Sequence, residues 1–231
     1  MKTSNMLKIS GLAFLCVVIG YGAGSMAKLS ADDCKADVLE TVKTVDMAEI
    51  NQGTTEDGYF FIGSADAPVV MEEFTDYQCP YCQQYFFKTF QKIVDNYIAA
   101  GEVKYVFRDK PLPGHSRAAQ ASEATRCAGE QGQYFEMHKK LFTAQGEWSY
   151  TGDLDATLVS YATELGLDGD EFGTCIADTK YDTAIAKSVE DAEKIGISGT
   201  PSFTINGNVA VGALPYDSFK QAIEHFLGGN E

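Results

Sequence analysis

Short apolar runs separated by turn residues recur along the chain from residue 59 onwards. Apolar or β-branched runs bounded by Gly, Pro, Asn or Asp are typical of buried β-strands. Five segments fit this pattern: Tyr59–Ile62, Val69–Phe74, Val103–Phe107, Ser202–Ile205 and Val209–Val211. Asn206-Gly207 lies between the last two, and this pair supplies the two positive φ angles of a tight hairpin turn. We therefore expect the last two strands to form a hairpin.

A helical period begins directly after the second strand. Residues 80–100 carry apolar side chains spaced four, three and four residues apart, which predicts one stripe on a helix: Phe86, Phe90, Ile93 and Tyr97. One further step of four towards the N-terminus reaches Cys82. We expect Cys82 to face the core from the first turn, with Cys79 at the helix start and open to solvent.

The remaining helices are predicted in a long section and at the C-terminus. Residues 116–195 are predicted to form several helices separated by glycines, and residues 216–227 are predicted to form an amphipathic helix at the C-terminus. The order is strand, strand, helix, strand, helical block, helix, hairpin, helix. This is the order of an α/β thioredoxin-like fold, a central mixed sheet with flanking helices, interrupted by a helical insertion at about 115–185. We assign this domain to residues 59–231.

The N-terminal part has the pattern of a targeting segment. Lys2 and Lys8 precede a short apolar run, and small residues lead to a candidate cleavage site at Ser25-Met26-Ala27. Basic, apolar and small regions in this order are typical of a secretory signal peptide, here residues 1–27. The alternative is an uncleaved signal anchor, since the uncharged run approaches the ~20 residues that span a bilayer. Both interpretations predict export, with residues 28–58 as a polar N-terminal extension.

Composition narrows the functional classes. Hydrophobic residues make up 45% of the chain and charged residues 22%, which are ordinary globular values and exclude wholesale disorder. The formal net charge is −15 and the isoelectric point is about 4.5. Nucleic-acid binding needs clustered Lys and Arg, so we expect no nucleic-acid partner.

The six cysteines divide into four groups. Cys16 lies in the targeting segment, and Cys79 and Cys82 form the only C-x-x-C pair. Cys127 and Cys175 both lie in predicted helices, and we interpret them as a structural disulfide. Cys34 is then left over: it is free, paired between chains, or paired with Cys16 if the leader is retained.

The C-x-x-C pair at a helix start has a specific chemical use. Unpaired N–H groups and the helix dipole favour negative charge there, which lowers the pKa of the first thiol. A stabilised thiolate both attacks disulfides and leaves from them readily. Pro80 suits the first helical turn, where an N–H is not needed. A zinc site would need a second pair of ligands, and the chain has no other C-x-x-C and no His-x-x-x-His, so we expect no metal.

A second motif, Gly199-Thr200-Pro201, places a proline directly before a strand, where a cis peptide bond fits. Together with Phe-Thr-Asp-Tyr-Gln-Cys-Pro-Tyr-Cys at Phe74–Cys82, it resembles the DsbA-like bacterial thiol–disulfide oxidoreductases. Pro111-Leu112 and the Cys-Ala-Gly-Glu-Gln-Gly stretch at Cys127–Gly132 match one subgroup of that family. The resemblance spans roughly residues 59–228.

The resemblance implies roles for individual residues. Cys79 corresponds to the nucleophile, Cys82 to the resolving thiol and Pro201 to the cis-proline that packs against the disulfide. Thr200 offers its backbone to an extended substrate, a mode of binding that demands little sequence specificity. Pro80 and Tyr81 would border the bound substrate. The strongest oxidants of the family have His in place of Tyr81, which leaves the oxidising strength open.

Glu73 matches an acidic residue that the family buries beneath the active site. Strand alternation puts it on the same side as Val69 and Met71, and a buried carboxyl has a raised pKa and could take a proton from Cys82. The alternative is that Glu72 turns inward and Glu73 is exposed, because a one-residue register shift exchanges the faces.

Three other residues are assigned structural roles. His138 lies with apolar neighbours at helical spacing and is interpreted as a core histidine, and Trp148 as a core aromatic. His115 follows Pro113-Gly114 and is interpreted as a solvated turn residue, with a place at the border of the active site as the alternative.

The sequence therefore predicts an exported enzyme of the periplasm or cell envelope that forms or exchanges disulfides in unfolded or partly folded proteins with free thiols. By family analogy, a membrane redox partner would reoxidise it. No organic cofactor is required. Two alternatives stay open: an isomerase or reductase held in the reduced state, and a peptide-binding chaperone with secondary redox activity.

Overall fold

The computed structural model describes residue 45 and residues 50–228. The predicted signal segment 1–27 and Cys34 lie outside the described residues. Within residues 50–228, no helix combines the length and the apolar character needed to cross a membrane.

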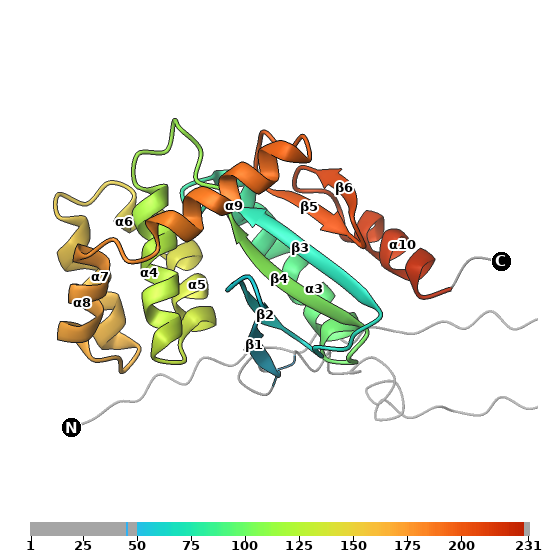
Figure 1. Cartoon of the computed structure of the whole chain (residues 1–231), viewed down its shortest axis with the longest axis horizontal. Coiled ribbons are helices and arrows are strands. Elements are labelled where there is room, and N and C mark those ends of the chain that lie inside the picture. Colours follow the sequence, from blue (N-terminus) through green and yellow to red (C-terminus); the bar gives the residue numbers. More distant parts are fainter. Residues whose placement is uncertain (1–44, 46–49, 229–231) are drawn as a thin grey trace, which may run out of the picture. The chain divides into compact units, whose positions relative to one another are not determined.

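A six-stranded mixed sheet forms the centre of the domain, in the order β1-β2-β4-β3-β5-β6 (Figure 1). The strands are β1 (Gln52–Thr54), β2 (Phe60–Ile62), β3 (Val69–Thr75), β4 (Val103–Asp109), β5 (Ser202–Ile205) and β6 (Asn208–Val211). Central strands β3 and β4 are parallel, and every other neighbouring pair is antiparallel. The five predicted strands and the hairpin are therefore confirmed, with Asn206 and Gly207 both at positive φ.

Strand β1 was not predicted, and it lies within the stretch assigned to the polar extension. None of its three residues is buried, and it gains its strand conformation by pairing with β2. Gly53 fits there because a Cβ would lie 2.6 Å from the Phe61 ring. A polar three-residue edge strand carries no hydrophobic period, so the sequence offered no signal for it.

Helices cover both faces of the sheet. One face packs against the segment α2 (Pro80–Tyr85), η2 (Phe86–Phe90), α3 (Gln91–Ile93) and η3 (Val94–Ile98), and against α10 (Tyr216–Phe226). Cys82, Phe90, Ile93 and Tyr97 are buried, as the apolar stripe predicts, and Phe86 is half-buried and packs against the same core as Phe90. The opposite face carries α9 (Asp182–Lys194), which crosses the sheet in Figure 1 and packs Ala192 against Phe74.

Five helices gather beyond one end of the sheet and build a second apolar core (Figure 1). They are α4 (Ala118–Glu130), α5 (Tyr134–Thr143), α6 (Gln145–Trp148), α7 (Leu154–Glu164) and α8 (Gly169–Ala177). The predicted helical section at 116–195 is confirmed. Trp148 is fully buried and its indole N–H donates to the Leu141 carbonyl at 2.8 Å, as a core aromatic should.

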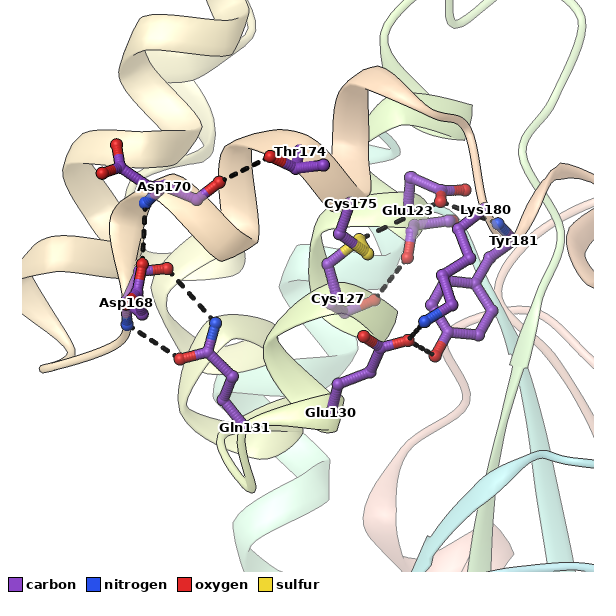
Figure 2. The surroundings of a disulfide bond; sticks show 12 residues. Glu123, Cys127, Glu130, Gln131, Asp168, Asp170, Thr174, Cys175, Lys180 and Tyr181 are labelled. Atoms are coloured by element: carbon purple, nitrogen blue, oxygen red, sulfur yellow. Dashed lines mark hydrogen bonds and ion pairs between the residues drawn. A yellow bond between two sulfur atoms is a disulfide. The ribbon is translucent and has the colours of Figure 1, made fainter.

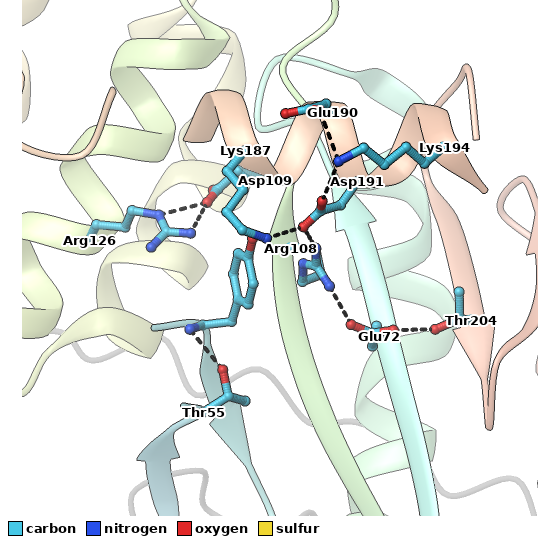
Figure 3. A network of polar contacts seen from close by, with 11 residues as sticks. Thr55, Glu72, Arg108, Asp109, Arg126, Lys187, Glu190, Asp191, Lys194 and Thr204 are labelled. Carbon is cyan, nitrogen blue, oxygen red and sulfur yellow. Dashed lines mark hydrogen bonds and ion pairs between the residues drawn. The ribbon is translucent and has the colours of Figure 1, made fainter. Parts of the chain in front are cut away.

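Ion pairs fasten α9 to the sheet (Figure 3). Arg108 on β4 lies between Glu72 at 2.6 Å and Asp191 at 3.2 Å, and it stacks on the Tyr59 ring. On the neighbouring position of the strand, Asp109 forms a buried ion pair with Arg126 of α4 at 2.6 Å. These pairs hold α4 and α9 in place above the ends of the central strands.

Candidate active site

The two cysteines follow the C-terminal end of β3. Cys79 is the N-cap of α2 with φ −75° and ψ 123°, and Pro80 is the first helical residue. Cys82 is completely buried, while Pro80 and Tyr81 are exposed. Both cysteines are thiols in this structure. The helix start thus carries the first thiol at its N-cap and encloses the second within the first turn.

Cys79 is only 4% exposed, so the expectation that it is open to solvent is wrong. Two segments cover it. The thiol lies 3.4 Å from the Thr200 carbonyl oxygen, and Cys79 packs in the apolar cluster of the helical insertion. Helical periodicity places a residue on a face of its own helix but gives no sign of a loop from elsewhere in the chain that closes over it.

That loop carries the one cis peptide bond among the described residues, Thr200–Pro201. Register explains why it meets Cys79. Phe74 on β3 pairs with Ser202 on β5, so the residues just after β3 and just before β5 meet at one edge of the sheet. The structure therefore brings Cys79, Cys82, Thr200 and Pro201 together.

The two thiols have opposite acidities. A hydrogen bond from the Cys82 thiol is the largest influence on Cys79, and with the N–H groups of residues 81 and 82 it lowers the pKa of Cys79 to about 6 despite burial. Burial raises the pKa of Cys82, and its interaction with Cys79 and the charge of Glu73 raise it further. At neutral pH Cys79 is the thiolate and Cys82 keeps its proton.

Glu73 lies inside the protein beneath the cysteines. It is 1% exposed, whereas Glu72 is half-buried and paired with Arg108, so the predicted inward side is confirmed. Burial raises the pKa of Glu73 to about 7, although the Tyr105 hydroxyl, which donates to it at 2.7 Å, opposes the shift. A carboxyl with this pKa exchanges protons readily near neutral pH.

His138 behaves as the predicted core histidine. It is 1% exposed, Nδ1 lies 2.9 Å from the Tyr77 hydroxyl, and burial lowers the pKa of the ring to about 3. The imidazole is therefore neutral, and its burial among aromatic rings confirms the core role.

Asp76 and Gln145 carry no role predicted from the sequence, and His115 takes the place that was its alternative, at the border of the active site. Asp76 is fully buried and accepts hydrogen bonds from its own loop and from residues 112 and 115. His115 lies 2.8 Å from Asp76, so its interpretation as a solvated turn residue is wrong, and it borders the site. The Gln145 amide donates to the carbonyls of Tyr77 and Cys79 at 2.7 Å and 3.1 Å. The insertion thereby holds the loop that carries Cys79.

A disulfide joins Cys127 of α4 to Cys175 of α8, with 5.9 Å between the Cα atoms (Figure 2). Glu123 lies beside it and accepts a hydrogen bond from the Tyr181 N–H at 2.7 Å. Burial raises the pKa of Glu123 to about 6. Glu123 and the two sulfurs have the spacing of metal ligands, but a thiolate and not a disulfide sulfur is the ligand, so the bonded pair does not fit a metal ion.

A family model described as thioredoxin matches residues 54–225. The chain belongs to the thioredoxin family. Its mixed sheet with flanking helices is the thioredoxin-like fold of the solved structures to which it is similar. The structure of Wolbachia pipientis alpha-DsbA1 has a TM-score of 0.66 and 29% identity and covers 73% of this chain and 90% of its own. Oxidised BdbD from Bacillus subtilis has a TM-score of 0.66 and 25% identity and covers 73% of this chain and 92% of its own. The structural neighbours are thus DsbA-type proteins.

Sequence relatives are of two kinds. Disulfide bond formation protein D of Bacillus subtilis is 29% identical over 179 residues, 73% of this chain and 77% of that protein. The Na⁺/H⁺ antiporter NhaA 1 of Salinispora arenicola is 34% identical over 168 residues, 72% of this chain. The chain spans only 24% of that antiporter's length, so the similarity concerns one part of it.

Proposed function

We propose that this protein is a thiol–disulfide oxidoreductase that forms or exchanges disulfides in exported envelope proteins through Cys79 and Cys82. The observation that supports this best is the acidic Cys79 thiol at a helix N-terminus beside cis-Pro201. The likeness to alpha-DsbA1 and to disulfide bond formation protein D supports the same chemistry.

In the oxidising direction the enzyme starts with a Cys79–Cys82 disulfide. A substrate thiolate attacks the Cys79 sulfur, a mixed disulfide forms, and Cys82 leaves as a thiolate and takes up a proton. A second substrate thiolate then attacks the substrate sulfur of the mixed disulfide, and Cys79 leaves as a thiolate. The substrate loses two electrons and gains a disulfide, and the enzyme ends as a dithiol. The low pKa of Cys79 favours both its attack and its departure.

The substrate would bind to the surface around Cys79. Tyr81 is 62% exposed next to the nucleophile, and Val211, at the end of β6, the outermost strand of the sheet within residues 50–228, is 62% exposed as well. Pro201 is linked to this strand end, since its carbonyl accepts from the Gly212 N–H at 2.8 Å. An extended peptide of an unfolded protein would lie along Thr200 and Pro201 with main-chain hydrogen bonds, beside Pro80 and Tyr81.

Glu73 serves in this scheme as the proton acceptor for Cys82 when the dithiol is reoxidised. Its carboxyl must be ionised to accept, so the step slows as pH falls through about 7. We expect Glu73→Gln to slow turnover, to keep the fold and to lose this inflection, as measured by stopped-flow reoxidation between pH 5 and 9. A variant with the wild-type pH profile would remove the role from Glu73.

The Glu73→Gln variant should also differ from wild type in how its free energy of unfolding depends on pH. The pKa of Glu73 is 4.5 unfolded and about 7 folded, so the folded state binds the proton more tightly. This stabilisation is complete below pH 4.5 and is lost as pH rises through 7. Relative to wild type, Glu73→Gln should therefore gain stability in urea unfolding as the pH is raised.

Export and the redox partner belong to the proposal as well. The basic, apolar and small regions in residues 1–27 support secretion to the periplasm or cell envelope, with or without cleavage. A dithiol enzyme needs an electron acceptor after each turnover, and a membrane redox partner would supply it.

The direction of exchange is tested by two assays on the purified protein and one in the cell. We expect the oxidised protein to reactivate reduced ribonuclease and Cys79 to be trapped oxidised in the cell by acid quenching and alkylation. Rescue of scrambled ribonuclease alone, with Cys79 trapped reduced, would instead establish an isomerase or reductase. Folding assistance that survives Cys79→Ala would establish a chaperone.

A further inference from the structure

Asp76 is a buried carboxylate with an unusual number of partners. Its side chain is fully buried, and each carboxylate oxygen accepts two hydrogen bonds. Oδ1 accepts from the N–H groups of Gln78 at 2.7 Å and Cys79 at 3.1 Å. Oδ2 accepts from the N–H of Leu112 and from Nδ1 of His115, both at 2.8 Å. All four hydrogen bonds are therefore made by donors that point at a carboxyl enclosed by the protein.

The four donors come from two separate segments. Residues 78 and 79 follow β3, and residues 112 and 115 follow β4, the parallel neighbour of β3. The backbone of Asp76 also contacts both cysteines: its carbonyl accepts from the Cys79 N–H at 3.0 Å, and its N–H lies 3.5 Å from the Cys82 sulfur. One residue thus joins the cysteine loop to the 111–115 loop.

We propose that Asp76 is a positioning residue for Cys79: its carboxylate ties the cysteine loop to the 111–115 loop and so holds the Cys79 sulfur at the start of α2. The proposal rests on the proposed function only in giving Cys79 the role of nucleophile. Asp76 acts through the backbone of residues 78, 79 and 112 and through His115.

Charge and geometry predict opposite effects, so their balance is measurable. By charge alone, a carboxylate near Cys79 disfavours the thiolate, and removing it would lower the pKa of Cys79. By geometry, removing it frees the loop from the helix N-terminus, and the pKa of Cys79 rises towards that of an ordinary thiol. The four donors, three backbone N–H groups and the His115 ring, offset the charge of the carboxylate. We therefore expect the geometric effect to be the larger one and the pKa of Cys79 to rise when Asp76 is removed.

The test is a titration of the Cys79 thiolate by ultraviolet absorbance in the reduced protein. Asp76→Ala should raise the pKa of Cys79 by about one unit, a tenfold loss of thiolate below the pKa. Asp76→Asn should give an intermediate value. Its oxygen can still accept from residues 78 and 79, but its NH₂ group meets the Leu112 N–H.

Asp109→Asn is the matched control. Asp109 is 1% exposed and is the last residue of β4, so it is buried near the same end of the sheet as Asp76. Its carboxylate pairs with Arg126 and not with either cysteine. The control should lose stability and keep the wild-type pKa of Cys79. If Asp76→Ala does not fold, Asp76→Asn carries the test.

A Cys79 pKa at or below the wild-type value in a folded Asp76 variant overturns the proposal, and so does an equal rise in Asp109→Asn. The titration reads the thiol directly and needs no turnover. A protein inactive on ribonuclease whose Cys79 pKa responds to Asp76 would therefore contradict the proposed function and support the positioning role.

Discussion

Cys82→Ala is expected to accumulate a covalent adduct with disulfide-containing proteins, whereas Cys79→Ala forms none. In the first variant the Cys79 thiolate still attacks a disulfide, but no second thiol is present to resolve the mixed disulfide. In the second variant the remaining thiol is Cys82, which is fully buried and whose pKa is raised by burial. A buried, protonated thiol is a poor nucleophile.

Non-reducing gel electrophoresis after incubation with an oxidised substrate protein measures the adduct, and dithiothreitol should release it. The wild-type protein is the control, because there Cys82 resolves the adduct within turnover. Turnover in the ribonuclease assay should be lost in both variants. Adducts of similar yield in the two variants would show that the asymmetry of the two thiols is not what selects the nucleophile.

Local patterns in the sequence were sufficient for the parts of the site that lie on one element. The period of the 80–100 helix placed Cys82 inside, and alternation along β3 placed Glu73 inside and Glu72 at the surface side. In both cases the relevant burial depends on a single repeating geometry, 3.6 residues in a helix or two in a strand. Such inferences need no knowledge of the other elements.

The rest of the site depends on contacts that no local pattern records. Asp76 meets residues that lie 36 and 39 positions later, and Cys79 meets a carbonyl 121 positions later. Each contact follows from the register of the sheet, which places the ends of parallel β3 and β4 and the start of antiparallel β5 at one edge. Asp76 belongs to the Phe74–Cys82 motif, but only the order of the strands reveals which groups its side chain binds.

The helical insertion contacts the cysteine loop at this end of the sheet and so forms part of the candidate site. Gln145 fixes the carbonyls of residues 77 and 79, and Cys79 and Cys82 pack in the same apolar cluster as Cys127 and Cys175. A change that loosens α4 against α8 therefore acts on the core that encloses Cys79, and the stability of the insertion affects the surroundings of that thiol.

The Cys127→Ala/Cys175→Ala double variant is expected to lose about 4 kcal/mol of unfolding free energy on the loop-entropy model. The cross-link spans 48 residues and joins α4 to α8, and without it the unfolded chain regains the freedom of that loop. For a domain of this size the loss corresponds to a fall of roughly 8–16 °C in the melting temperature.

Urea unfolding of the double variant, of wild type and of wild type with the Cys127–Cys175 disulfide reduced separates the contributions to this loss, with Cys79 and Cys82 kept as thiols in all three samples. If the constraint on the loop is its cause, reduced wild type and the double variant should unfold at similar urea concentrations, since both lack the cross-link. The sulfur atoms of the reduced protein still fill the space between α4 and α8, whereas alanines leave a cavity, so any further loss in the variant measures packing. A double variant as stable as the oxidised protein would mean that the apolar contacts of the two helices alone hold the insertion together. The Cys127–Cys175 disulfide would then contribute nothing to the stability of the core around Cys79.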